Sequence, residues 1–160
     1  VYEEGAMERS VYLPEGTWID FWTGAIYEGG QYLTASAPLE IIPVYVRCGS
    51  ILPIQSQDGL KLKVYSGITP AFGGQVYRDA GDGYGAHRID KFSVTWEDTD
   101  LLIAMETEGD FAPEDEVISF EIVGIGLRGV LVDGVEIPFT GSSFKTRPFQ
   151  RCRILTKSQA

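Results

Sequence analysis

The residues best suited to acid–base chemistry are two aspartates in a glycine-rich run, Asp79 and Asp82. A pair of carboxylates can hydrolyse a glycosidic bond when the two groups lie about 5 to 9 Å apart across a sugar-sized cleft. The same run is also typical of a tight turn, because Asp side chains bond nearby backbone N–H groups and Gly accepts a positive φ. Read as an EF-hand calcium loop, it carries Gly81 at the third position and Asp90 instead of Glu at the twelfth. We therefore interpret this run as a turn and predict no metal.

A nucleophile activated by a histidine is not predicted. His87 is the only histidine, and no serine or cysteine forms a recognisable catalytic motif with it. We expect His87 to lie at the surface, in a loop or at a strand edge. The sequence therefore predicts no catalytic residue, no bound cofactor and no activity for this chain alone.

Two cysteines, Cys48 and Cys152, are too few for a disulfide scaffold and lack the CxxC or Cys/His spacing of a zinc site. Both lie among residues typical of β-strands, so we expect buried free thiols. This pattern favours a reducing, cytoplasmic compartment.

The charge of the chain excludes two classes of partner. The 160 residues carry a formal net charge of −10, whereas nucleic acids and anionic membranes bind cationic surfaces. No apolar run approaches the ~20 residues that span a bilayer. Acids gather between Phe92 and Leu127, where no Lys or Arg occurs, and we expect six of them on one solvated loop rather than in a calcium site. These six are Glu106, Glu108, Asp110, Glu114, Asp115 and Glu116.

Short strands separated by Gly and Pro account for the whole chain, and helical spacing of apolar residues is missing. The expected fold is therefore all-β, with two small antiparallel β-sandwich domains. We place the boundary in the polar stretch 55–59, which gives domains 1–57 and 58–160. The expected strands are 8–13, 17–23, 27–34, 60–65, 75–78, 92–96, 101–107, 118–122, 130–137 (a hairpin with an Asp-Gly turn) and 151–156.

The first domain is rich in aromatic residues for its size. A free-standing unit of fewer than ~60 residues buries only about 60% of its surface and is marginally stable. Its aromatic side chains therefore either pack against a neighbouring domain or stack on sugar rings. Side chains that could make such contacts are Trp18, Trp22, Tyr27 and Tyr32 in the first domain, and Tyr77, Tyr84 and Trp96 in the second.

The order of residues adds a family resemblance. Residues 9–24, RSVYLPEGTWIDFWTG, resemble the start of the proximal C-terminal domain of glycoside hydrolase family 31, which includes α-glucosidases and α-xylosidases. Residues 37–39 and 42–53, APL and IPVYVRCGSILP, resemble the family's APL…IPVFVRAGSIIP stretch, with Cys48 where Ala is usual. Residues 76–84, VYRDAGDGY, resemble LYEDDGDGY of the distal domain, but Arg78 and Ala80 remove two acids.

This resemblance implies a pair of β-sandwich domains that follow a catalytic (β/α)₈ barrel carrying the catalytic aspartates. Because Val1 is not an initiating Met, we read the chain as part of a longer polypeptide. The expected function is structural support of that upstream barrel, which would hydrolyse α-glucosidic or α-xylosidic bonds. Two alternatives stay open: a carbohydrate-binding module that contacts oligosaccharide, and a self-standing interaction or assembly domain.

Overall fold

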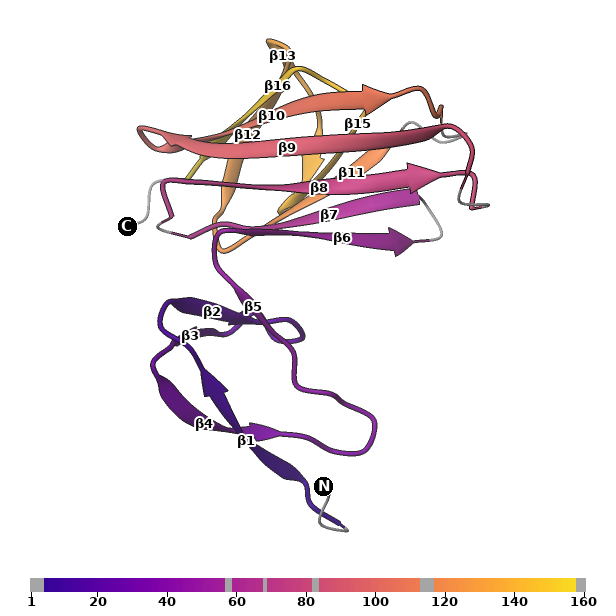
Figure 1. Cartoon of the computed structure of the whole chain (residues 1–160). Coiled ribbons are helices and arrows are strands. Elements are labelled where there is room, and N and C mark those ends of the chain that lie inside the picture. Colours follow the sequence, from indigo (N-terminus) through magenta and orange to yellow (C-terminus); the bar gives the residue numbers. More distant parts are fainter. Residues whose placement is uncertain (1–4, 57–58, 68, 82–83, 113–116, 158–160) are drawn as a thin grey trace. The chain divides into compact units, whose positions relative to one another are not determined.

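The computed structural model describes residues 5–56, 59–67, 69–81, 84–112 and 117–157, and every regular element within these ranges is a β-strand (Figure 1). The predicted all-β class is confirmed. Within the same ranges, no helix long and apolar enough to cross a membrane occurs. The chain divides into two compact units, Val1–Cys48 and Gly49–Ala160.

The first unit contains two small antiparallel sheets. Strands β1 (Glu8–Leu13) and β4 (Gln31–Ser36) form one of them. The other has the order β3-β2-β5, from β2 (Thr17–Asp20), β3 (Ile26–Glu28) and β5 (Tyr45–Arg47).

Two strands expected in this unit are shorter than the sequence predicted. The strand expected at 17–23 ends at Asp20, because the Asp20 carboxylate accepts hydrogen bonds from the backbone N–H groups of Trp22 (2.9 Å) and Thr23 (2.7 Å) and turns the chain. The strand expected at 27–34 is two strands, since Gly29 and Gly30 separate β3 from β4.

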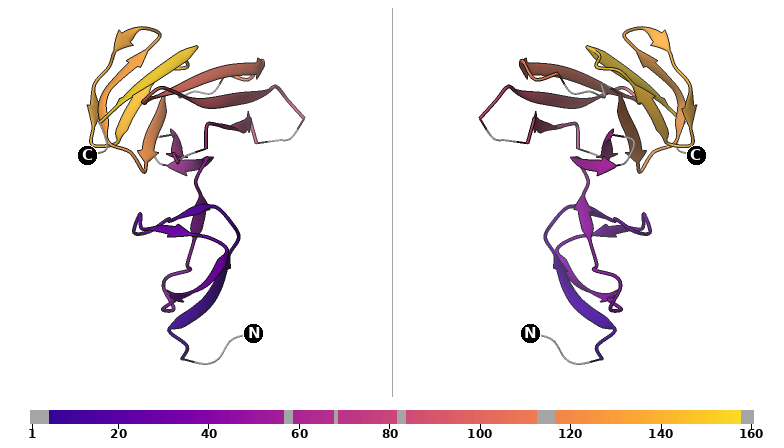
Figure 2. Two further views of the ribbon diagram at one scale, coloured as in Figure 1. Left: turned by 90° about the vertical axis from the view of Figure 1, so that its left-hand side faces the viewer. Right: turned by 90° about the vertical axis from the view of Figure 1, so that its right-hand side faces the viewer.

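The second unit is a β-sandwich of two sheets. A six-stranded sheet has the order β13-β12-β16-β10-β9-β8, and a five-stranded sheet has the order β14-β15-β11-β7-β6. Figures 1 and 2 show these strands from three sides. The strands are β6 (Ser50–Ser56), β7 (Gly59–Tyr65), β8 (Ala71–Asp79), β9 (His87–Glu97), β10 (Asp100–Gly109), β11 (Ile118–Val123), β12 (Leu127–Val132), β13 (Val135–Glu136), β14 (Phe139–Thr140), β15 (Ser143–Thr146) and β16 (Arg151–Thr156). The pairing of β7 with β11 is parallel.

Strand β6 explains why the two units divide between Cys48 and Gly49 and not at 57/58. It pairs with β7 from Ser50↔Tyr65 to Ser56↔Gly59, so it belongs to the sandwich. The polar stretch 55–59 therefore joins two neighbouring strands. Pro53 lies on β6, at the edge of the five-stranded sheet, a position where proline is tolerated because one side of the strand has no ladder partner.

The predicted alternation of apolar residues is confirmed in the second unit. Ile118, Phe120 and Ile122 are all buried on β11, and intervening residues face outward. Phe120 is the centre of the core, with its ring 5.1 Å from Phe144 and 5.7 Å from Phe149. The Asp133-Gly134 hairpin also forms, with positive φ at both residues (47° and 83°), as a type I′ turn requires.

The two thiols differ in burial. Cys152 lies in the core of the sandwich and Cys48 is half-buried, and both are free. Burial, aided by the Asp133 carboxylate, raises the pKa of the Cys152 thiol to about 12. Burial, aided by Glu28, also raises the pKa of Cys48.

We expect a thiol reagent at pH 8 to modify Cys48 slowly and Cys152 only when the sandwich unfolds, because the thiolate is the reacting form. Mass spectrometry of the labelled peptides, with and without denaturant, measures this difference. Equal labelling of both thiols in the native chain would contradict the buried position of Cys152.

Candidate functional site

The chain turns after β8, at Asp79, as the sequence predicts. The Gly81 N–H donates to the Asp79 carboxylate at 2.9 Å, and Gly81 has a φ of +88°. Asp82 lies outside the described residues, so the separation of the two carboxylates stays untested. His87 begins β9, is exposed and stacks against Tyr77 with ring centroids 5.9 Å apart. This arrangement positions no base next to a nucleophile.

The expected acidic loop is partly wrong. Glu106 and Glu108 lie on β10, and Glu108 pairs with Lys91 of β9 at 2.5 Å. Asp110 follows the strand, and the run 114–116 lies outside the described residues. Among the residues that the structure describes, no group of three or more acidic, Cys or His side chains could hold a metal ion.

The two tryptophans of the first unit have fixed polar ends, and Trp18 is half-buried whereas Trp22 is exposed. The Trp18 indole N–H donates to the Pro14 carbonyl at 2.8 Å, and the Trp22 indole N–H donates to the Ile42 carbonyl at 2.8 Å. Trp22 is nevertheless 58% exposed. Tyr27 is half-buried and meets Tyr45 edge-on.

The aromatic side chains of the second unit do not come together into one platform. Tyr77 and Tyr84 are strongly exposed, but Trp96 is half-buried. Tyr77 faces Ile89 across the β8–β9 pair, whereas Trp96 is seven residues further along β9, a span of about 23 Å at 3.3 Å per residue. Any sugar contact by Trp96 is therefore separate from one by Tyr77.

Most of the exposed large hydrophobic side chains among the described residues are on the first unit. Eight of the eleven large hydrophobic side chains that are exposed in the described residues belong to it, and three to the second unit. Leu39 is 96% exposed and Ile42 is 75% exposed. We call the eight side chains the apolar surface: Met7, Tyr12, Trp22, Ile26, Tyr32, Leu39, Ile41 and Ile42.

The interior of this unit is correspondingly small. Its fully buried hydrophobic side chains among the described residues are Leu13, Ile19 and Ala35. A soluble domain that stands alone rarely exposes so many apolar side chains for so few buried ones.

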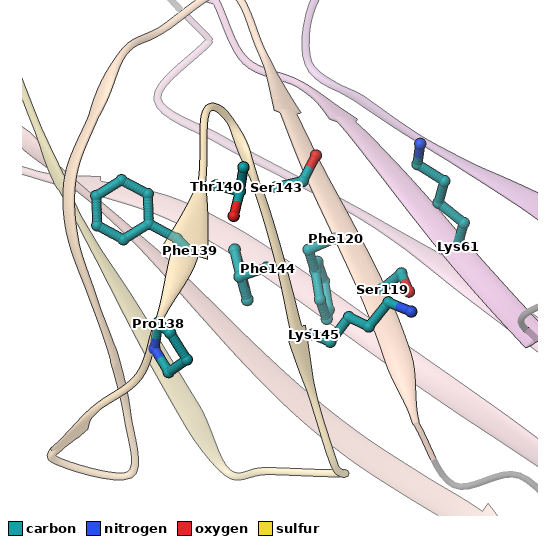
Figure 3. A pocket seen from close by; sticks show the side chains of 9 residues that line it. All are labelled: Lys61, Ser119, Phe120, Pro138, Phe139, Thr140, Ser143, Phe144 and Lys145. Atoms are coloured by element: carbon teal, nitrogen blue, oxygen red, sulfur yellow. The ribbon is translucent and has the colours of Figure 1, made fainter.

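A first hollow, of about 540 Å³, lies on the outer side of the five-stranded sheet (Figure 3). Lys61 and Lys145 lie on either side of Ser119, which pairs with both. The rings of Phe120 and Phe144 that border it are buried in the core. Lys61 and Lys63 both pair with Glu121, so the lysines of this face are partly neutralised.

A second hollow, of about 390 Å³, lies where several strands of the sandwich end. It is lined by side chains and backbone from three separate segments of the second unit. These residues are Trp96, Thr99, Gly124, Ile125, Gly126, Thr156 and Lys157.

A buried ionic cluster lies near the opposite end of β9, and the sequence analysis did not predict it. Asp90 is fully buried and accepts hydrogen bonds from Arg88 Nε (2.7 Å), from Thr107 Oγ1 (2.8 Å) and from Arg78. Burial alone would raise the pKa of Asp90, but the hydrogen bonds from Arg88, Thr107 and Arg78 outweigh it and hold that pKa below its usual value. We interpret this cluster as a structural element, since the Asp90 carboxylate joins side chains of three neighbouring strands, β8, β9 and β10, by hydrogen bonds.

Comparisons with known proteins agree on one family. The family model of the glycosyl hydrolase family 31 C-terminal domain matches residues 1–52. An alpha-xylosidase from Saccharolobus solfataricus is 32% identical over 152 residues, which cover 84% of this chain and 20% of that protein. A lysosomal alpha-glucosidase from Bos taurus is 28% identical over 160 residues, which cover 84% of this chain and 16% of that protein. The chain thus spans a fifth or less of the length of the curated relatives it matches.

Solved structures have the same fold. The crystal structure of a GH31 alpha-xylosidase from Xanthomonas citri is 30% identical, with a TM-score of 0.71, over 98% of this chain and 18% of that chain. A GH31 dextranase from Flavobacterium johnsoniae, complexed with glucose, has a TM-score of 0.76 at 23% identity and covers 99% of this chain and 25% of its own.

Proposed function

Because this chain belongs to the C-terminal β-sandwich region of glycoside hydrolase family 31, we propose that it is a non-catalytic support for a catalytic barrel in the same polypeptide. The barrel would hydrolyse α-glucosidic or α-xylosidic bonds and would carry the catalytic aspartates. The first unit would be the proximal C-terminal domain and the second the distal one.

The observation that carries this proposal is the apolar surface of the first unit. Eight large hydrophobic side chains of this unit are exposed, whereas three of its described hydrophobic side chains are buried. Covering apolar surface is worth about 25 cal/mol per Å², so a partner that covered it would stabilise both itself and this unit. Trp18, Trp22 and Tyr27 supply rigid rings for such a contact, since hydrogen bonds or ring packing within the unit already fix them.

A glycosidase assay of the chain by itself tests whether it is non-catalytic. We expect the purified 160-residue chain to release no aryl leaving group from α-glucosides or α-xylosides. Measurable turnover that persists through repeated purification would refute the non-catalytic assignment.

A double substitution in the parent enzyme tests the support role. We expect Leu39→Ser with Ile42→Ser to lower the stability of the catalytic barrel by about 2 kcal/mol, because two covered aliphatic side chains are lost. Both side chains are mostly exposed, so the fold of their own unit should change little. Thermal inactivation of the parent activity, followed together with barrel tryptophan fluorescence, measures the effect.

The matched control is Tyr84→Ser with Val135→Ser, which removes two exposed apolar side chains of the second unit. We expect the control to leave barrel stability unchanged. If both double variants behave like the unsubstituted parent, the apolar surface does not support the barrel.

A further inference from the structure

We propose that the second hollow, beside Trp96, binds a neutral saccharide. Its volume of about 390 Å³ falls within the ~300 to 1,000 Å³ typical of small-molecule sites. Trp96 is the only tryptophan of the second unit, and it borders this hollow. The rest of the lining is polar or glycine, except for Ile125.

Hydrogen bonds hold the segments around the hollow in place before any ligand arrives. The Trp96 indole N–H donates to the Gly67 carbonyl at 3.0 Å, which fixes the plane of the ring. The Thr156 hydroxyl donates to the Thr99 carbonyl at 2.7 Å, and the Lys157 N–H donates to the Gly126 carbonyl at 2.9 Å. A site that is already ordered loses little conformational entropy on binding.

The chemistry around the hollow selects among ligand classes. Lys157 is the one charged side chain among the residues that line the hollow, and the neighbouring Arg153 is held in ion pairs with Glu97 and Asp100. A single exposed lysine attracts an anion only weakly in water. A wholly apolar ligand would leave the Thr156 hydroxyl covered without a partner for its oxygen lone pairs.

A pyranose satisfies both requirements, because it has an apolar C–H face and a rim of hydroxyl groups. The C–H face would lie against the Trp96 ring, as in other contacts of aromatic side chains with apolar surfaces. The hydroxyl groups would donate to Thr156 Oγ1 and accept from the Lys157 ammonium group. The first hollow has the half-buried ring of Phe139 but no tryptophan, and its other two rings, Phe120 and Phe144, are buried.

Indole and amide resonances of the 160-residue chain, titrated with maltose and with isomaltose, test the site. We expect saturable shifts of the Trp96 indole N–H and of Gly124 to Gly126, with a Kd in the millimolar range, and no shift of the Trp18 and Trp22 indoles. Sodium sulfate at the same concentration, as an anionic probe, should leave these resonances in place. The choice of α-linked sugars rests on the proposed function.

A Gly126→Val substitution should block the hollow. A Cβ at Gly126 would lie 3.2 Å from Lys157 Cδ, which belongs to a flexible side chain, and the φ of Gly126 is outside the left-handed region. We expect binding at least tenfold weaker. Trp96→Phe keeps a ring packed against the core and should weaken binding about threefold, because part of the stacking surface is lost. Thr140→Val, in the first hollow, is the matched control and should bind as the unsubstituted chain does.

Unshifted Trp96 and Gly124–Gly126 resonances at saturating sugar would overturn the inference. Equal affinity of the Gly126→Val variant would overturn it too. Neither outcome depends on contact with a barrel, so failure here is distinguishable from failure of the support role, which the stability of the parent enzyme reports.

Discussion

Asp90→Ala is expected to destabilise the second unit by about 3 to 5 kcal/mol, the usual cost of removing one partner from a buried ion pair. Asp90 is 0% exposed, and Arg88, its neighbour on β9, is 8% exposed. Without the carboxylate, two guanidinium groups face each other in the interior, and the Nε of Arg78 already has no hydrogen-bond partner. Urea unfolding of the 160-residue chain, followed by circular dichroism, measures the loss.

Urea unfolding at several pH values distinguishes the contribution of the Asp90 charge to stability from the contribution of its packing. The pKa of Asp90 is lower in the folded chain than its ordinary value, so the unfolded chain binds this proton more readily. The contribution of Asp90 is therefore fully present above its ordinary pKa, near 4, and is lost as the pH falls through the lower folded value. Asp90→Asn should flatten this part of the stability profile.

Asp110→Ala, at an exposed aspartate after β10, is the control and should change the unfolding free energy by about 0.5 kcal/mol or less. If Asp90→Ala were as mild as this control, the two arginines would find other partners, and the cluster would not be structural.

The burial of this cluster shows how far alternation along a strand can predict structure. Period-2 alternation from Phe92 to Trp96 correctly predicts the inward face of β9. Extended backwards, the same period gives inward positions to Asp90 and Arg88, which the polar residue types concealed. Their third partner, Arg78, follows only from the register in which Arg78 pairs with Arg88 on the neighbouring strand. A single sequence does not determine which residues of two neighbouring strands lie opposite each other.

The division into units shows the limit of composition as a guide. The stretch 55–59 is polar because it connects two strands of one sheet, and polar residues suit either a connection or a linker. What distinguishes the two is the pairing of β6 with β7, a contact between residues on both sides of that stretch. The family resemblance over residues 9–54 also extends across Cys48 and Gly49 and hides the division.

The candidate site depends still more on three-dimensional arrangement. The sequence singled out Trp96 together with Tyr77 and Tyr84, because all three are aromatic. In the fold, Trp96 borders the second hollow with residues from the 124–126 and 156–157 segments. Those residues are two glycines, an isoleucine, a threonine and a lysine with no motif of their own, so no spacing rule could have brought them together.

Gly29→Ala is expected to unfold the first unit while leaving the second intact. Gly29 is the one glycine of this unit where an added Cβ would meet backbone, since the Cβ would lie 1.8 Å from the Pro14 carbonyl oxygen and 2.9 Å from that of Gly16. A flexible side chain could move away, but the turn at residues 14–16 is held by the Gly29 N–H, which donates to the Gly16 carbonyl at 2.7 Å. The Pro14 carbonyl also accepts the Trp18 indole N–H.

Moving that turn would break both hydrogen bonds, at about 1 kcal/mol each, and would add backbone strain, for a total of about 3 kcal/mol or more. A unit with three fully buried hydrophobic side chains has little stability with which to absorb this loss. In amide spectra of the 160-residue chain, we expect resonances of residues 5–48 to collapse to unfolded positions and those of the sandwich to remain. In the parent enzyme, the proposed support role predicts that the same substitution lowers the stability of the barrel.

Gly24→Ala is the matched control. A Cβ at Gly24 meets no atom within 4 Å, and only its φ of +75° is unfavourable, which costs roughly 1 to 2 kcal/mol. If Gly29→Ala leaves the first unit as well folded as Gly24→Ala does, the turn at 14–16 can move freely, and packing around Gly29 does not determine this unit. If the first unit unfolds in the isolated chain but the parent keeps its stability, the unit is not the support that its apolar surface indicates.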